Sequence, residues 1–122
     1  MKYTTLTMNG KEYKLRLGAA HIEQLEKHLG GRNPLDLLMA AENGNLPPLT
    51  GTLRILHSSM QKFQHGISWS DVQNIYDEYV DEGNTYTDLL PHLIEVFQIS
   101  GFFKKAPEAG EKTGATNGEG NQ

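Results

Sequence analysis

The sequence predicts a mainly α-helical (α+β) domain, in which an N-terminal β-hairpin precedes about five helices and a disordered tail ends the chain. Two observations on spacing support this. Hydrophobic residues alternate with a period of two only near the N-terminus, and thereafter recur every three or four residues, as in amphipathic helices. The third observation is compositional: segment 106–122 has four glycines and none of the large apolar side chains that a core needs.

The length of 122 residues allows one hydrophobic core. We therefore expect a single hairpin plus helical domain over residues 1–105. The Gly-rich tail over 106–122 is expected to be disordered, because it cannot bury enough surface to offset the entropy lost on ordering.

Composition excludes several classes of function. Cysteine is absent, which removes disulfides, thiolate metal sites and cysteine nucleophiles. The net charge is -4 and the 11 Lys and Arg residues are scattered, so we expect no nucleic-acid partner. No apolar run approaches the roughly 20 residues of a membrane helix, and no signal-peptide pattern opens the chain. We expect a cytoplasmic protein without a membrane partner.

The hairpin prediction rests on Asn9-Gly10, the preferred pair for a two-residue type I′ turn. A turn there places Leu6 opposite Tyr13 and Thr4 opposite Leu15. One face of the hairpin then carries its apolar residues, which must pack on helices because an isolated hairpin is marginally stable in water. These residues are Leu6, Met8, Tyr13, Leu15 and Leu17.

Start and stop signals divide the rest of the chain into helices. The first runs from Ala19 to Gly30-Gly31, and the second begins at Pro34 with Asn33 as N-cap and Asp36 in its first turn. The third follows Pro47-Pro48, reaches Gly66 and is predicted to be the longest. The fourth begins with a Ser68/Asp71 capping box and stops at Gly83.

The start of the last helix is ambiguous. If Asp88 caps it, Pro91 lies harmlessly in the first turn, whereas a start at Thr85 would place Pro91 further in and distort the helix. We favour Thr85. The residues expected to face inward along the five helices are Ile22, Leu25, Leu29, Leu35, Leu38, Met39, Leu49, Leu53, Leu56, Met60, Phe63, Trp69, Val72, Ile75, Tyr76, Tyr79, Val80, Leu89, Leu90, Leu93, Ile94 and Phe97.

Residue patterns that would indicate an enzyme are missing. The five histidines show no HExxH spacing, no G-x-S-x-G elbow surrounds a serine, and "LGGRNP" lacks the lysine of a phosphate-binding loop. We therefore predict no catalytic, cofactor-binding or metal-binding residues, and expect a protein that is not an enzyme.

Two groups of residues are candidates for partner binding. Asp77, Glu78, Asp81 and Glu82 lie on the outward side of the fourth helix near its C-terminus, where the helix dipole disfavours negative charge. They form either a solvated face or a docking stripe for a basic partner.

The second group is Phe102 and Phe103, in "SGFFKK". These aromatic residues either close the core after the last helix or form an exposed pair that a partner covers.

The order of elements resembles that of a known family. A hairpin reading "MNGKEYKLRL" is followed by "HIEQLEKHLGGRNPLDLL", "TGTLRILHSSMQKFQHGIS", "LLPHLIEVFQISGFF" and a polar tail. Over residues 3–103 this looks like the tail assembly chaperones of long-tailed, siphovirus-type bacteriophages and prophages. No motif of that family assigns binding residues, so none is carried over.

The resemblance implies a chaperone that binds the long, helical, aggregation-prone tape measure protein, keeps it soluble and helps to recruit tail tube protein. It would work in the cytoplasm of the infected or lysogenic host and be missing from the mature virion. A longer form produced by programmed frameshifting would give the tail a role as a linker. The sequence does not decide between a monomer and a homo-oligomer. The alternatives are a small phage-encoded regulator of transcription and a minor structural tail component.

Overall fold

The fold comes from a computed structural model, which describes residues 2–103 apart from the side chains of Ala41 and Glu42. The tail predicted to be disordered over 106–122 lies outside the described residues, as does the predicted domain end at 105. In chain order the elements are β1 (Thr4–Met8), β2 (Lys11–Leu15), α1 (Ala19–His28), α2 (Pro34–Met39), a 3-10 turn (Ala40–Asn43), α3 (Leu49–Met60), α4 (Trp69–Asp81), a 3-10 turn (Tyr86–Leu89) and α5 (Leu90–Ile99). The predicted hairpin followed by five helices is confirmed.

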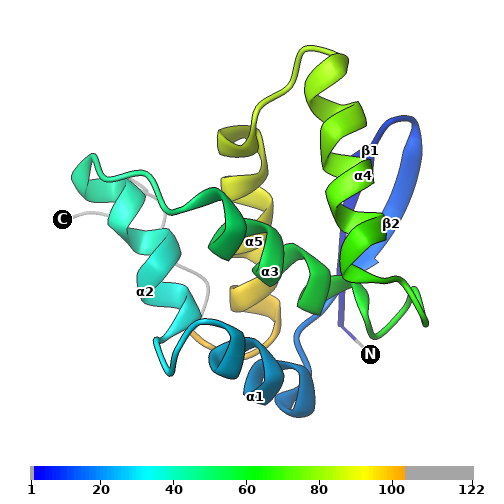
Figure 1. The fold of residues 1–122 in the computed structure, drawn as a ribbon. Coiled ribbons are helices and arrows are strands. Elements are labelled where there is room, and N and C mark those ends of the chain that lie inside the picture. The colour runs from blue at the N-terminus through cyan, green and yellow to red at the C-terminus, as the bar shows by residue number, and fades with distance from the viewer. Residues whose placement is uncertain (1, 104–122) are drawn as a thin grey trace, which may run out of the picture.

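Helix α3 is the centre of the molecule, and it packs against α1, α2, α4, α5 and β2. Figure 1 shows it crossing in front of α5, with α1 and α2 on one side and α4 and the hairpin on the other. Eight of its 12 residues are buried. A Cβ on Gly51 would lie 2.7 Å from a methyl carbon of Leu37, so glycine allows α2 to approach α3 closely.

The hairpin has the predicted register, with Leu6 opposite Tyr13 and Thr4 opposite Leu15. Asn9 and Gly10 have φ angles of 55° and 79°, as a type I′ turn requires. All the residues predicted for its apolar face are buried, and they join the core formed by α3 and α5.

The outer edge of β2 is protected by the chain itself. The Gln64 side chain accepts a hydrogen bond from the Lys14 backbone N–H at 3.0 Å and donates one to the Lys14 carbonyl at 2.9 Å. Two residues after Lys14, the Arg16 backbone N–H donates a hydrogen bond to the Ser59 carbonyl at 2.9 Å. Backbone groups that would otherwise pair with a foreign strand are therefore occupied.

The helices start where the caps predict. The Asn33 side chain accepts a hydrogen bond from the Leu35 N–H at 2.9 Å. Ser68 and Asp71 form a reciprocal capping box, with both hydrogen bonds at 2.9 Å. Gly83, with a φ of 97°, ends α4 as expected.

The structure resolves the ambiguity at Pro91. Thr85 caps the 3-10 turn Tyr86–Leu89, again with a capping box to Asp88, and the α-helix proper begins only at Leu90. Pro91 thus lies in the first turn of α5, where its missing N–H removes no helical hydrogen bond. The distortion that we predicted within the helix is instead a 3-10 turn in front of it.

The third helix was wrongly predicted as the longest: α3 has 12 residues and α4 has 13. It ends at Met60, and the chain then turns before it reaches Gly66. Phe63 lies in this turn and meets the Tyr3 ring edge-to-face, with ring centroids 5.4 Å apart. Leu49 and Val80, predicted to face inward, are 40% and 42% exposed. Figure 1 shows why for Val80: the C-terminal half of α4 extends beyond α3.

Loss of the Gln64 side chain should destabilise the hairpin. We expect Gln64→Ala to lower the free energy of unfolding by about 1–2 kcal/mol, because it removes both hydrogen bonds to the Lys14 backbone. Urea unfolding followed by circular dichroism measures the change. Gln98→Ala on α5 is the control, and equal stability of the two variants would show that the β2 edge does not need this protection.

Candidate functional site

Helix α4 forms a ridge between two grooves. The larger, which we call the hairpin groove, has a volume of about 720 Å³ and lies between α4, β2 and the loop that follows α3. The smaller, the α3–α4 groove, has a volume of about 390 Å³ and lies between α4 and the N-terminal half of α3. Asn74 and Asp77 line both grooves, so they stand on the crest of the ridge.

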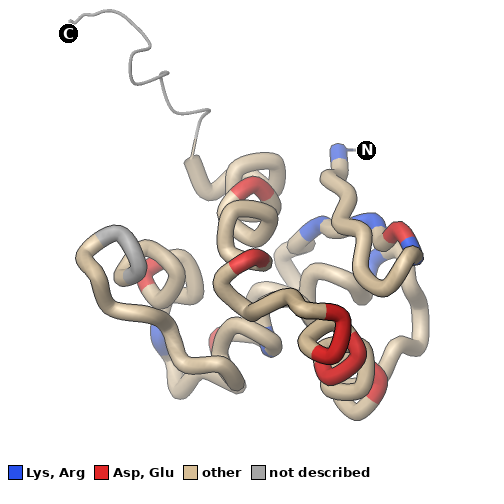
Figure 2. Tube along the Cα trace, turned by 90° about the horizontal axis from the view of Figure 1, so that it is seen from above, with Lys and Arg blue, Asp and Glu red and all other residues tan. Residues whose placement is uncertain are grey.

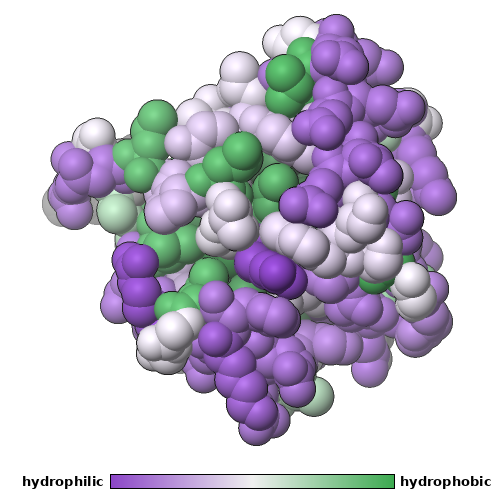
Figure 3. Space-filling model, in the orientation of Figure 1, coloured by the Kyte–Doolittle hydropathy of each residue, from purple (hydrophilic) through white to green (hydrophobic). Residues whose placement is uncertain are grey.

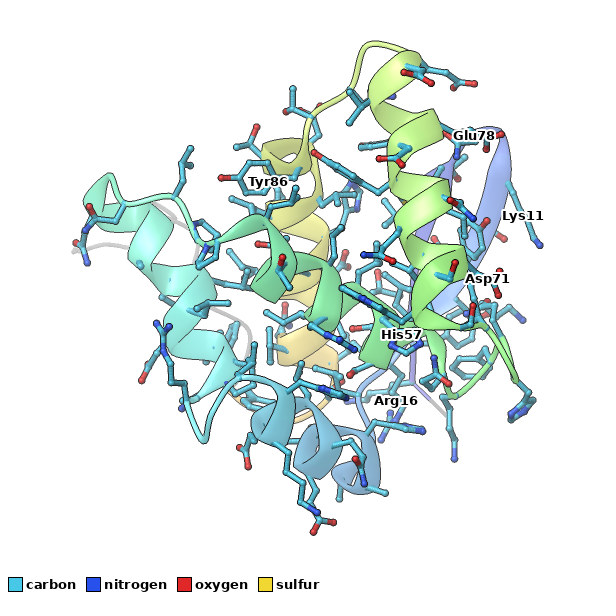
Figure 4. The ribbon with its side chains drawn as sticks, in the orientation of Figure 1. Lys11, Arg16, His57, Asp71, Glu78 and Tyr86 are labelled. Carbon is cyan, nitrogen blue, oxygen red and sulfur yellow. The ribbon has the colours of Figure 1, made fainter. Side chains whose placement is uncertain are left out.

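The hairpin groove combines a partly apolar floor with carboxylates. Tyr13, Ile67 and Ile75 supply apolar surface, while Asp71 and Glu78 come from α4. Figure 4 shows Lys11 on the hairpin and these two carboxylates on the neighbouring side of α4. The Lys11 ammonium lies 5.3 Å from the centre of the Tyr13 ring, and burial raises the pKa of Tyr13, so its phenol stays protonated at neutral pH.

The turn of the hairpin is joined to α4 through Asn9. Its side-chain amide donates to the Ile75 carbonyl at 3.0 Å and to a carboxylate oxygen of Glu78 at 3.2 Å. Asp71 is engaged in the cap of α4, and hydrogen bonds from Ser68 hold the pKa of its carboxyl below the usual value. The carboxylates of Asp77 and Asp81, which also line this groove, accept no side-chain hydrogen bond among residues 2–103.

The four acidic candidates are placed together by α4. Asp77, Glu78, Asp81 and Glu82, here called the acidic face, are all exposed. The first three line the hairpin groove, and within the described part of the chain none of the four forms a salt bridge. Figure 2 shows Asp and Glu concentrated on α4, and Lys and Arg on the hairpin.

The α3–α4 groove is built from leucines on α3 and aromatic residues on α4. Leu49 and Leu53 form one wall, and Trp69 and Tyr76 are in the other. The Arg54 guanidinium stacks 3.8 Å from the centre of the Trp69 ring, which holds the indole in place. Figure 3 shows apolar residues gathered on this face of the molecule.

His57 fixes the loop between α3 and α4. Its Nε2 lies 3.0 Å from the Ile67 carbonyl, and its ring packs edge-on against Trp69 at 5.9 Å. Burial lowers the pKa of His57, so the neutral ring donates its Nε2–H to this carbonyl at neutral pH. The histidine therefore has a structural role, because it holds Trp69 and the loop before α4 in place.

Phe102 and Phe103 are half-buried after the end of α5 and pack against the core. The Phe102 ring meets that of Phe97 edge-to-face with a centroid distance of 4.7 Å. This placement matches the core-closing alternative. Neither phenylalanine lines a groove, so the structure does not join this pair to the acidic face.

Sequence reasoning missed the α3–α4 groove because it assigned Leu49 and Val80 to the core. A signal was present in "NLPPLT": two prolines hold Leu46 outside the helix that Leu49 begins. Leu46 is the most exposed large apolar residue that the structure describes, at 60%.

Over the described range, no three His, Asp or Glu side chains gather closely enough to hold a metal ion. No helix between residues 2 and 103 is both long enough and apolar enough to cross a bilayer.

The profile of a protein family of unknown function, DUF6096, matches residues 1–121. The chain belongs to this family. No protein with a curated description and no solved structure matches it. The DUF6096 match covers the hairpin, all five helices and both grooves, so the site described above is part of the family's domain.

Neutralising the acidic face should stabilise the fold. We expect Asp77→Asn, Glu78→Gln, Asp81→Asn and Glu82→Gln together to raise the melting temperature by about 2–6 °C, because the C-terminal end of a helix disfavours negative charge. Calorimetry measures the shift. Asp36→Asn is the control. It removes a negative charge from the first turn of α2, where the helix dipole favours that charge, so it should lower the melting temperature. A lower melting temperature for the fourfold variant would contradict this prediction, because it would show that other interactions of the four carboxylates outweigh their repulsion by the helix dipole.

The cap at Asp71 predicts a pH dependence of stability. Because its folded pKa lies below the ordinary 3.8, the stabilisation is fully present above about pH 3.8 and is lost as the pH falls through the folded value. The stability difference between the wild type and Asp71→Asn should therefore shrink as the pH falls below about 3.8. Denaturant unfolding at each pH measures it. Ser68→Ala removes the hydroxyl and keeps the backbone N–H donor, so in that background the pH dependence should weaken only in part, and its complete loss would show that the backbone N–H is not the main cause.

Proposed function

We propose that this chain is a bacteriophage tail assembly chaperone, which binds the tape measure protein, keeps it soluble and aids assembly of the tail tube around it. The observation that carries the proposal is an apolar surface beside an acidic one. Leu49, 40% exposed, lines the α3–α4 groove. Val80, 42% exposed, continues the stripe of α4 that borders this groove, and Leu46, 60% exposed, shortly precedes α3 in the chain. Such a surface suits a protein that covers apolar helix faces of a partner.

The architecture agrees with the resemblance that the sequence suggested. The quoted hairpin is β1 and β2, and the three helical segments correspond to α1 with α2, to α3 with the loop after it, and to α5. The acidic face lies on α4, between the last two of these segments. A hairpin and helices in this order are what the family of chaperones implies.

Binding, rather than catalysis, is the activity that fits the polar residues. Ser58 and Ser59 are buried, and the Ser59 hydroxyl donates to the Ile55 carbonyl at 2.7 Å. His57 is tied to the Ile67 carbonyl. The side chains that line the grooves are thus suited to contact a polypeptide, and the proposed protein works without a cofactor.

In the proposed role the protein acts in the cytoplasm of the infected or lysogenic host and leaves before the virion is complete. Tail tube protein is the second partner, and a frameshifted longer form of the chain would carry a further segment beyond the helical domain. Covalent linkage would raise the local concentration of whatever this segment binds near the chaperone.

Co-expression tests the function directly. The tape measure protein encoded in the same phage or prophage should be insoluble alone and become soluble, in a complex with this chain, when the two are co-expressed. The soluble fraction and the complex are measured by size-exclusion chromatography. An unrelated acidic helical protein of similar size is the control.

A tape measure protein that stays equally insoluble in both co-expressions would contradict the chaperone function. Detection of the chain in purified virions by mass spectrometry would instead indicate a structural tail component. A salt-dependent shift of duplex DNA would indicate a regulator.

A further inference from the structure

The α3–α4 groove has the side-chain spacing of a helix-binding seam. Along α4, the residues Trp69, Gln73, Tyr76 and Val80 follow one another at intervals of four, three and four, so they form one stripe on the helix. This is the spacing with which a helix meets another helix side by side. Trp69, Gln73 and Tyr76 line the groove, and Val80 continues the stripe by one turn.

Over residues 2–103, the stripe on α4 becomes more exposed toward its end, from the half-buried Tyr76 to Val80, which is 42% exposed. Helix α3 packs against α4, yet Figure 1 shows it crossing near the N-terminal half of α4, while the C-terminal half extends beyond α3 with the hairpin on its other side. Opposite the stripe, Leu49 and Leu53 are one helical turn apart on α3, and Leu46 precedes them. The groove therefore offers apolar contacts on two walls.

Charge decides which kind of helix fits. Asp77 lines the α3–α4 groove, and Asp81, which lines the hairpin groove, lies one helical turn further along the same side of α4. Both carboxylates are exposed and form no salt bridge within the described residues. A helix lying in the groove would place the residues that flank its apolar stripe next to these carboxylates, where Lys and Arg are attracted and Asp and Glu are repelled.

We propose that the α3–α4 groove binds an amphipathic helix of a partner protein, with an apolar stripe seated between α3 and α4 and Lys or Arg residues paired with Asp77 and Asp81. In the proposed function this helix belongs to the tape measure protein, and in that respect the inference rests on the proposed function. The groove itself is tested without that protein.

The probe is a synthetic helical peptide of about 20 residues that has leucines at heptad spacing, flanking lysines and no tryptophan. A matched peptide carries Glu in place of Lys. Binding to the full chain is measured by the fluorescence anisotropy of the labelled peptide. Its location is read from the emission of Trp69, the only tryptophan of the chain, which lies in the groove.

We expect the Lys/Leu peptide to bind at least about tenfold more tightly than the Glu/Leu peptide, and to shift Trp69 emission. Leu49→Ser with Val80→Ser should weaken binding by about tenfold, because these exposed residues supply apolar contact in the complex. Asp77→Asn with Asp81→Asn should weaken it by about threefold or more and flatten its salt dependence.

Matched controls lie elsewhere on the surface. Tyr3→Ser removes a 44% exposed apolar residue on the hairpin side, and Glu26→Gln with Glu95→Gln removes two exposed helical carboxylates. These variants should bind like the wild type, and thermal melts show that all variants fold.

Several outcomes would overturn the proposal. The proposal is wrong if the Lys/Leu peptide does not bind, if both peptides bind equally well, or if binding leaves the Trp69 emission unchanged. It is also wrong if the control variants lose as much peptide affinity as the groove variants. A dimer in sedimentation that the peptide does not dissociate would assign the groove to a second copy of the chain.

The inference and the proposed function fail in different ways. If the wild type solubilises the tape measure protein and the Leu49/Val80 variant does so equally well, the groove is wrong and the chaperone function stands. If the peptide binds in the groove and the tape measure protein stays insoluble, the groove stands and the function is wrong.

Discussion

The burial of α3 is the constraint on which the other elements depend. This helix contacts α1, α2, α4, α5 and β2, and Leu53, Ile55, Leu56 and Met60 on its different sides are at most 5% exposed. Each neighbour buries its own apolar face against α3, so a single helix organises the core. The polar residues enclosed with it are compatible with this position, since the Thr52 and Ser59 hydroxyls donate to carbonyls one turn earlier in the same helix.

The site follows from how α4 is attached to that core. Val72 and Tyr79 bury one side of α4, Asn9 links it to the hairpin turn, and the remaining sides face solvent as a ridge. Two grooves arise because α3 and the hairpin approach the ridge from different directions. Trp69, held by Arg54 and His57, closes the narrow end where α3 and α4 meet.

Much of the fold was predictable because its signals are local. The Asn9-Gly10 turn sets the hairpin register through backbone conformation alone, and the Asn33 and Ser68 caps satisfy N–H groups within three residues of their own position. Predictions failed where the outcome depended on distant residues. Leu49 and Val80 have the spacing of core residues, but which turns of α3 and α4 are covered depends on how the two helices cross.

The sequence by itself determined the hairpin, the number of helices, their caps and the acidic face, since these follow from turn chemistry, capping and periodicity along the chain. Only the tertiary structure decided that Asp77 of the acidic face lines two grooves and that Leu46, Leu49 and Val80 remain exposed, Leu49 in the smaller groove. The physical reason is that periodicity identifies the apolar side of a helix, whereas exposure depends on the area that packed neighbours cover. In this chain α3 is covered nearly everywhere and α4 along one side, and that difference creates the candidate binding surface.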